Sequence, residues 1–217
     1  MLNRFKETHG KLIIKITGQD RLAYAFSDFA DLYDLTEWAE RGGYQGSVIY
    51  FYDLANGSVY HPFEKKRNVA YGKPVYFDGF YYFLRADYDR KDVLLYKYVP
   101  EKEPEVVKFF DLREMDLYNL AIMGEGINVV SQSDKLTCYY PSKFSFELKD
   151  NETVTMIKDG SVYVESWVEE GWDHQNNCAS ENYEYYNKVI VKDFEGKTLS
   201  EERGCLFQND DGNWWIA

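Results

Sequence analysis

Apolar and polar positions of this chain alternate in short runs. Most of the sequence consists of segments rich in Val, Ile, Tyr, Phe and Trp, separated by Gly, Asp, Asn or Pro at intervals of about ten residues. Side chains of these types favour extended backbone, because β-branched and aromatic groups pack well on a pleated surface. The pattern therefore predicts an all-β protein.

One hairpin pattern recurs along the chain. An acidic residue and a glycine separate two apolar runs at Asp78-Gly79, Glu125-Gly126, Asp159-Gly160 and Asp211-Gly212, and a looser copy at the front turns at Gly18. Asp-Gly supplies the positive φ angles that tight two-residue turns need. These glycines lie about 48 residues apart on average, near the roughly 40–50 residues of a propeller blade.

A second hairpin lies in each interval between these markers. Its predicted turns are at Asn56-Gly57, at residues 100–104, at Pro141-Ser142 and at Glu195-Gly196. Two hairpins per period make a four-stranded meander, which is the repeating unit of a β-propeller.

Two segments, 78–82 (Asp-Gly-Phe-Tyr-Tyr) and 211–215 (Asp-Gly-Asn-Trp-Trp), place an aromatic pair after the Asp-Gly turn. On these features the chain resembles the β-propeller superfamily, particularly bacterial repeats with this turn, over nearly its whole length. The resemblance implies one domain over residues 1–217, with about five four-stranded blades and a last blade completed by residues 3–8. An open arrangement, a four-bladed ring and a β-sandwich are alternatives, and this architecture does not specify a function.

Two long connections interrupt the predicted meanders. In residues 29–46, Phe29, Leu32, Tyr33 and Leu35 have near-helical spacing and Gly42-Gly43 provides a stop, so one short helix is expected near residues 29–41. Such a helix could instead simply cover a sheet edge. Residues 168–183 are polar and are expected to form a loop, the kind of segment in which function often resides.

In a propeller, both connections would emerge on the same face. Their aromatic side chains and one histidine would form a candidate ligand-binding surface in an acidic setting, suited to protein, peptide or sugar partners. The alternative is that each aromatic residue only fixes its own loop. The predicted binding residues are Tyr33, Trp38, Tyr44, Trp172, His174 and Tyr183.

The net negative charge of the chain argues against two classes of partner, nucleic acids and anionic membranes. The 217 residues include 37 acidic and 25 basic ones, a net charge of -12, so the sequence offers no basic surface for nucleic acid or an anionic membrane. The N-terminal residues lack the apolar run of a secretory signal, and no window has about 18 apolar residues. A cytoplasmic location is the default expectation.

No recognised catalytic motif is present in the sequence. The three histidines and three cysteines are scattered, which predicts neither a metal site nor a disulfide framework, and no cofactor is expected. Four carboxylates invite comparison with five-bladed glycoside hydrolases, although turn geometry accounts for three of them. These carboxylates are Asp78, Glu125, Glu165 and Asp211.

The sequence favours a non-enzymatic binding module that recognises a protein or peptide, and a homo-oligomer is compatible with this hypothesis. The alternative is a carbohydrate-active propeller, either a sugar-binding lectin or a glycoside hydrolase. Two or three carboxylates about 5–10 Å apart at one end of an axial channel would favour the hydrolase.

Overall fold

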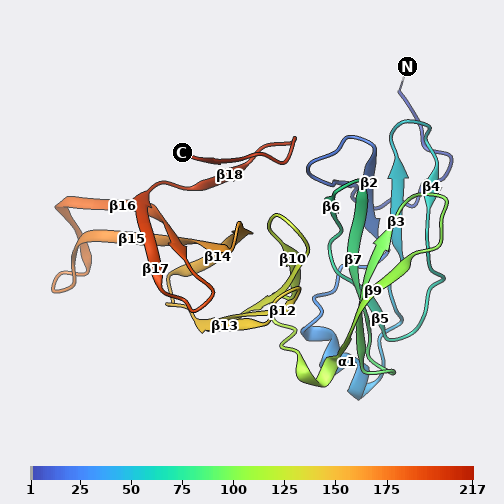
Figure 1. Cartoon of the computed structure of the whole chain (residues 1–217), viewed down its shortest axis with the longest axis horizontal. Helices are drawn as coiled ribbons and strands as arrows, with labels where there is room; N and C mark the ends of the chain where they lie inside the picture. Colours follow the sequence, from blue (N-terminus) through green and yellow to red (C-terminus); the bar gives the residue numbers. More distant parts are fainter. Residues whose placement is uncertain (1) are drawn as a thin grey trace. The chain divides into compact units, whose positions relative to one another are not determined.

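The computed structural model describes residues 2–217 (Figure 1). Strands dominate these residues and form antiparallel sheets; one α-helix, α1 (Asp34–Arg41), and one 3-10 helix, η1 (Leu112–Glu114), are also present. The predicted all-β class and single short helix are confirmed. The chain divides into two compact units, and the division falls within strand β10.

Unit 1 comprises residues 2–122 together with Asp210–Gly212. Its first sheet has the order β1-β2-β3-β4, and its second has the order β5-β7-β8-β9, with β6 also paired to β7. The strands are β1 (Ile14–Lys15), β2 (Leu22–Phe26), β3 (Ile49–Asp53), β4 (Val59–Tyr60), β5 (Val69–Tyr71), β6 (Val75–Phe77), β7 (Phe80–Asp87), β8 (Asp92–Tyr98) and β9 (Glu105–Asp111).

Unit 2 comprises Met123–Asn209 and Asn213–Ala217. Two sheets have the sequential orders β10-β11-β12-β13 and β14-β15-β16-β17, and β18 pairs with β19 in a third. The strands are β10 (Ala121–Met123), β11 (Asn128–Gln132), β12 (Lys135–Tyr140), β13 (Phe144–Glu147), β14 (Glu152–Lys158), β15 (Ser161–Asp173), β16 (Cys178–Lys192), β17 (Thr198–Arg203), β18 (Leu206–Gln208) and β19 (Trp214–Ile216).

The predicted Asp-Gly turns join adjacent strands. Phe77 pairs with Phe80, and Lys158 pairs with Ser161, so each of these turns contains two residues. Both residues of each turn have positive φ, 48° and 81° in the first and 50° and 75° in the second. This backbone follows the twist of the flanking strands, which explains why an aspartate and a glycine occupy these positions.

The two units have separate hydrophobic cores. In unit 1, buried side chains from the first two sheets pack together around Phe51 and Phe83, both fully buried. In unit 2, side chains from the sheets β10–β13 and β14–β17 pack around Leu136 and Val162. Each core is built because alternate residues of a strand point to the same face of its sheet.

The N-terminal segment was predicted to complete the last sheet, and that prediction is wrong. Among residues 2–217, β18 and β19 form a two-stranded sheet. The segment instead follows the first sheet: the Lys6 N–H donates to the carbonyl of Gly57 at 2.8 Å, and the Phe5 ring lies 4.9 Å from that of Tyr52. An apolar contact and a backbone hydrogen bond thus hold these residues beside β3 and β4.

The predicted helix is present but begins later than residue 29. The Asp31 carboxylate accepts the Tyr33 N–H at 2.8 Å, and the main-chain carbonyl of Asp31 accepts the Leu35 N–H at 3.2 Å. Residues 31–33 therefore form the entry turn, and the helix starts at Asp34. A short polar side chain that binds local N–H groups favours such an entry over a further helical turn.

The polar connection at residues 168–183 was expected to be a loop, and most of it is β-structure. Strands β15 and β16 continue as a long two-stranded ribbon whose register runs from Val162 opposite Lys192 to Asp173 opposite Cys178. Composition suggested a loop, but each strand of this ribbon supplies the hydrogen-bond partners of the other. The loop is confined to residues 174–177.

None of the helices formed by residues 2–217 has the length and apolar character required to cross a lipid bilayer.

Candidate functional site

Helix α1 is fixed firmly to unit 1. Leu35 is fully buried on its inner face, and Leu32, just before the helix, is also buried and offers its carbonyl to the Tyr88 hydroxyl. At the other end, the N–H groups of Gly42 and Gly43 both donate to the Trp38 carbonyl, at 3.2 and 2.8 Å. Buried anchors and a closed C-terminus make the helix a stable platform.

Two large aromatic side chains at this helix are exposed to solvent. Tyr33 is 53% exposed and Trp38 is 54% exposed. The Tyr118 ring, also largely exposed, lies edge-on to Tyr33 with 5.6 Å between ring centroids. Exposed aromatic groups held by a fixed element are typical of interaction surfaces, because they bury much area with little loss of side-chain freedom.

Tyr33 and Trp38 border a groove of about 600 Å³ between α1 and the segment around η1, which we call the α1 groove. Its apolar wall includes Tyr33, Trp38, Leu112, Met115 and Leu117. Its charged rim has four carboxylates and two cations: Asp34, Glu37, Glu40, Asp116, Lys91 and Arg113.

One charge of each sign on this rim is paired with a residue outside the groove: Glu37 pairs with Arg41 at 3.4 Å, and Arg113 pairs with Asp111. The Arg113 guanidinium donates to the Asp111 carboxylate through both Nε and Nη2. That side-chain hydrogen bonding, together with the Arg113 N–H, lowers the pKa of Asp111 to about 2. The α1 groove therefore presents an apolar floor inside a predominantly negative rim.

Tyr44 was predicted to bind ligand, but its side chain belongs to the core. It is only 3% exposed and lies beneath Trp38, with 6.3 Å between ring centroids. Burial, followed by the neighbouring Asp28 carboxylate, raises the pKa of the Tyr44 hydroxyl. Its N–H donates to the Asn68 side chain at 2.6 Å. Tyr44 supports the platform from below.

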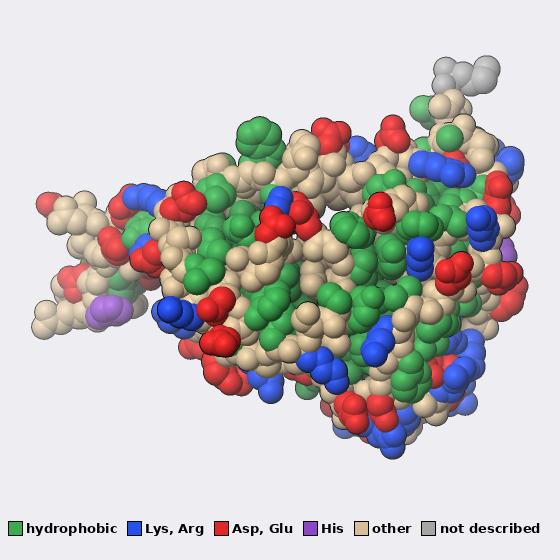
Figure 2. All heavy atoms as spheres, viewed as in Figure 1, with side chains coloured by type: hydrophobic (Ala, Val, Ile, Leu, Met, Phe, Trp, Pro, Cys, Tyr) green, Lys and Arg blue, Asp and Glu red, His purple; other side chains and the backbone are tan. Residues whose placement is uncertain are grey.

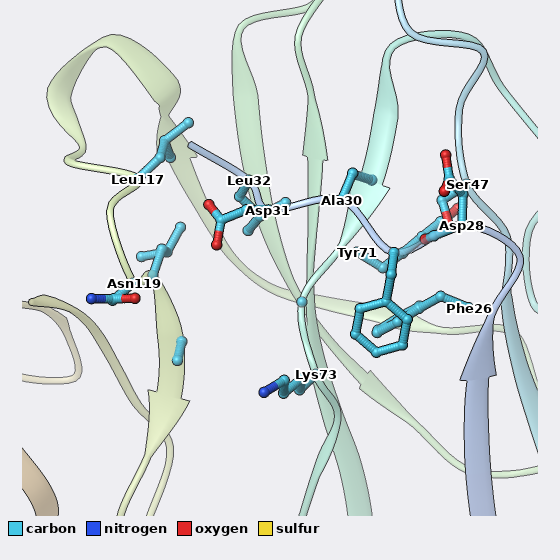
Figure 3. Close-up of a pocket in the computed structure, with 15 residues that line it drawn as sticks. Phe26, Asp28, Ala30, Asp31, Leu32, Ser47, Tyr71, Lys73, Leu117 and Asn119 are labelled. Carbon is cyan, nitrogen blue, oxygen red and sulfur yellow. The ribbon is translucent and has the colours of Figure 1, made fainter. Parts of the chain in front are cut away.

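A second cavity of unit 1, of about 470 Å³, lies beside residues 28–32 (Figure 3). In Figure 3, Asp28 and Ser47 lie close together on one side, and Asp31 and Asn119 lie on the other. The Ser47 hydroxyl donates to the main-chain carbonyl of Asp28 at 3.2 Å, so its proton is directed to the backbone and not to a base. This arrangement does not activate the serine as a nucleophile.

The other three predicted binding residues lie on the β15–β16 ribbon of unit 2. Trp172 and Tyr183 meet with their rings at 65° and centroids 5.9 Å apart, and His174 is exposed in the turn. The Asp173 carboxylate holds that turn by accepting the N–H groups of Gln175 and Asn176. The six residues were predicted to form one surface, and they divide into two groups, one in each unit.

The four carboxylates considered for glycoside hydrolysis have individual partners or turn positions. Asp78 is the first residue of a two-residue turn, and Glu125 pairs with Lys158 at 2.6 Å. Glu165 accepts the Thr155 hydroxyl at 2.9 Å and the Leu206 N–H at 2.8 Å. Asp211 lies in the loop between β18 and β19. The partners of Glu125 and Glu165 belong to the scaffold of unit 2.

Side chains that ligate metals are dispersed. Within residues 2–217, no group of three or more His, Cys, Asp or Glu side chains is placed to hold a metal ion. The three cysteines are free thiols, with Cys138 buried, Cys178 exposed and Cys205 half-buried. The His9 ring stacks on Tyr50 at 4.1 Å between centroids, a packing role within the first sheet.

Comparison of the chain with protein-family models, with curated proteins and with solved structures found no match.

Three aromatic residues of these surfaces escaped the sequence analysis. Tyr118 follows β9 and reaches α1 only through the tertiary fold, so no local pattern marks it. Trp167 and Tyr185 form a cross-strand pair on the ribbon, 6.4 Å between centroids. The alternation Tyr183-Glu184-Tyr185 was the available signal on one strand, whereas residues 167–172 do not alternate.

Proposed function

We propose that this protein is a non-enzymatic binding module that captures a segment of another protein in the α1 groove. The observation that carries the proposal is that Trp38 on α1 and Tyr33 just before it are more than half exposed, whereas Leu35 on the inner face of the helix is fully buried. Folding has fixed the helix while leaving its largest aromatic groups in water. Such groups contribute most when a partner removes them from solvent.

The rim indicates the chemistry of the partner. Four carboxylates, one of them paired with Arg41, stand against two cations, one of them bound by Asp111, and this excess of negative charge favours an apolar side chain flanked by Lys or Arg. The charge of -12 for the whole chain acts in the same direction, because it steers positively charged segments toward the surface. A protein or peptide with this pattern is the proposed ligand class.

A peptide-display selection with the full chain tests this proposal. The probe is a library of random 12-residue peptides, and the expected result is enrichment of peptides with an aromatic or aliphatic anchor beside Lys or Arg. Trp38→Ala should weaken the binding of a selected peptide about tenfold or more, as removal of an exposed anchor often does.

Trp215→Ala is the matched control, because Trp215 is also exposed, at 61%, but lies on β19. It should bind the selected peptides as the wild type does. Enrichment of peptides without basic residues, or equal binding by Trp38→Ala and the wild type, would refute the α1 groove as the binding site.

We also propose that the sequential four-stranded sheets are the blades of a β-propeller. The support is that β1–β4, β10–β13 and β14–β17 are each meanders in chain order, which is the connectivity of a blade. Small-angle X-ray scattering provides the test. A closed ring should give a radius of gyration near 17 Å, the value for a compact chain of this length. A value several ångströms larger for the monomer would argue for an open arrangement.

A further inference from the structure

The ribbon formed by β15 and β16 leaves its sheet after a few residues. Strand β14 accompanies β15 as far as Ser166, and β17 accompanies β16 from Lys188 onward. Between these points, residues 167–187, which we call the distal ribbon, pair with each other; in Figure 1 they project from unit 2 as a two-stranded hairpin. Open strand edges are templates for pairing with another extended chain.

One face of the distal ribbon already contains a cation supplied by the protein itself. The Arg203 guanidinium lies over the Tyr186 ring, 4.2 Å from its centroid, and pairs with the Glu184 carboxylate. The Tyr186 hydroxyl donates to Glu170 at 2.8 Å, which fixes the ring. An aromatic face beside a carboxylate is a favourable position for guanidinium, since both attract positive charge.

The opposite face of the distal ribbon also has aromatic rings beside a carboxylate, but no cation of residues 2–217 lies on them. Trp167 and Tyr185 pack at 6.4 Å, with 48% and 58% of their surfaces exposed. Glu169, directly across from Tyr185, accepts the Tyr183 hydroxyl at 2.7 Å. Within the described chain, no Lys or Arg lies over these two indole and phenol rings or pairs with Glu169.

Gly171 extends this face toward the turn. It has a φ of 71° and sits at a register shift between Glu170 and Trp172. The bulge changes the side-chain alternation, so Trp172 joins Tyr183 instead of pointing to the other face. We call the resulting row of rings, Trp167, Tyr185, Tyr183 and Trp172, the aromatic ladder.

We propose that the aromatic ladder, with Glu169, binds an extended segment of a partner protein that carries Arg or Lys at alternate positions. A strand presents every second side chain to one side, which matches rings arranged along a ribbon. A cation of the partner would occupy the position that Arg203 occupies on the other face. This surface lies in unit 2 and does not depend on the α1 groove.

The negative charge of the ribbon favours a basic segment over a second copy of the chain, nucleic acid or anionic lipid. Residues 161–187 contain six acidic residues and no Lys or Arg, and Figure 2 shows red acidic side chains among green hydrophobic ones on the projecting ribbon. A second copy of the ribbon would bring like charges together along the shared edge, which destabilises pairing. Nucleic acid and anionic lipid would be repelled as well.

The experiment uses the full chain, labelled with 15N, and the octapeptide acetyl-(Arg-Thr)4-amide as the probe. We expect saturable shifts of the Trp167 and Trp172 indole N–H resonances, and none with acetyl-(Gln-Thr)4-amide. The Trp167→Ala/Tyr185→Ala variant should lose about five- to tenfold in affinity, the scale of two exposed cation–π contacts. The Trp38→Ala variant should bind the probe as the wild type does, which separates this result from the proposal for the α1 groove.

Glu169→Gln supplies a variant that keeps the hydrogen bond with Tyr183, since an amide oxygen can accept it. It should weaken binding about threefold and flatten its salt dependence, whereas Glu202→Gln on β17, with the same loss of charge, should not. The proposal would be overturned if the Gln peptide bound as tightly as the Arg peptide. It would also be overturned if Trp167→Ala/Tyr185→Ala and Glu169→Gln both bound the Arg peptide with wild-type affinity. Sedimentation gives the remaining outcome. If the wild type forms concentration-dependent dimers and Trp167→Ala/Tyr185→Ala does not, the ladder binds a second copy of the chain and the proposal is overturned.

Discussion

Units 1 and 2 are built from similar antiparallel sheets but distribute their aromatic residues differently. The main core of unit 1 contains eight aromatic residues among thirteen buried ones, whereas that of unit 2 contains one among nine, Phe146. In unit 2 the large rings gather outside, on the distal ribbon, where Trp167 and Tyr185 are about half exposed. An aromatic run in the sequence therefore indicates a strand in both units. Only the burial of each side chain shows whether it packs in the core or is available to bind a partner.

The two units also differ in how they handle buried charge. Unit 2 buries one complete ion pair, Lys192 with Glu152, at 2.6 Å and with both side chains less than a tenth exposed. In unit 1 the fully buried Asp87 is bound by Lys66, whose side chain remains half exposed, and lies 3.4 Å from the nearly buried Arg85 guanidinium. A buried pair with both members desolvated is more sensitive to the loss of one member than a pair whose cation stays in water.

The largest expected effect tests the aromatic core of unit 1. Phe83→Ala should lower the free energy of unfolding by about 4–5 kcal/mol, the upper part of the range for such substitutions. Phe83 is fully buried and its ring lies 5.7 Å from both Phe51 and Tyr96, so the cavity would be lined by rigid rings. Urea denaturation followed by near-UV circular dichroism measures the change, and a loss below about 2 kcal/mol would contradict a tightly packed core.

The next effect tests the buried pair of unit 2. Glu152→Gln should lower the free energy of unfolding by about 3 kcal/mol, because the Lys192 ammonium would remain buried without its partner. The double variant Glu152→Gln/Lys192→Met should lose less than the single one. If the double variant is the less stable of the two in chemical denaturation, burial of the unpaired Lys192 ammonium is not what destabilises Glu152→Gln.

A smaller effect follows from Asp87 in unit 1. Burial raises its pKa, but hydrogen bonds from Lys66 and the Arg90 N–H, with the charge of Arg85, outweigh burial and leave the pKa below its usual value. A lowered pKa means that the stabilisation is present above about pH 4 and is lost as pH falls through the lowered value. Asp87→Asn should cost about 2 kcal/mol at pH 7.

The pH dependence provides the matching measurement. Denaturation midpoints between pH 6 and pH 2.5 should fall less steeply for Asp87→Asn than for the wild type. Parallel curves would show that Asp87 has the same pKa in the folded and unfolded chains.

The bulge of the distal ribbon should show a more modest effect. Gly171→Ala should lower the free energy of unfolding by about 1–2 kcal/mol, because φ is 71° and an added Cβ would lie 2.5 Å from the Asn182 carbonyl oxygen. The Trp172 indole resonance should shift as its contact with Tyr183 changes. Gly79→Ala is the control, since a Cβ there meets nothing within 4 Å and only the φ cost remains. Equal losses in both variants would show that the ribbon accommodates the Cβ.

The smallest effect sharpens the distinction between recognition and packing. Trp38→Ala should change the free energy of unfolding by less than about 0.5 kcal/mol, as expected for an exposed side chain. Tyr44→Ala, directly beneath it and 3% exposed, should cost several times more. Thermal melts of the two variants measure the difference. Similar losses would mean that Trp38 belongs to the core of unit 1 and not to a binding surface.

The sequence alone determined the features that depend on neighbouring residues. Asp-Gly at 78–79 and 159–160 determined two tight turns, and the aromatic and β-branched runs determined the strands beside them, because both depend on local backbone preferences. The helix near residues 29–41 was recognisable from its apolar spacing for the same reason. Two of the three aromatic residues predicted there, Tyr33 and Trp38, are exposed as a binding role requires.

Only the tertiary structure decided which side chains face solvent and which distant residues meet. Tyr44 is buried because Asn68, 24 residues away, and the Trp38 ring cover it, and Tyr118 joins Tyr33 across 85 positions of the chain. Residues 168–183 became a ribbon because each strand supplies the hydrogen-bond partners of the other, information that no single segment contains. Burial and cross-strand pairing are long-range properties, and the candidate surfaces of this protein depend on both.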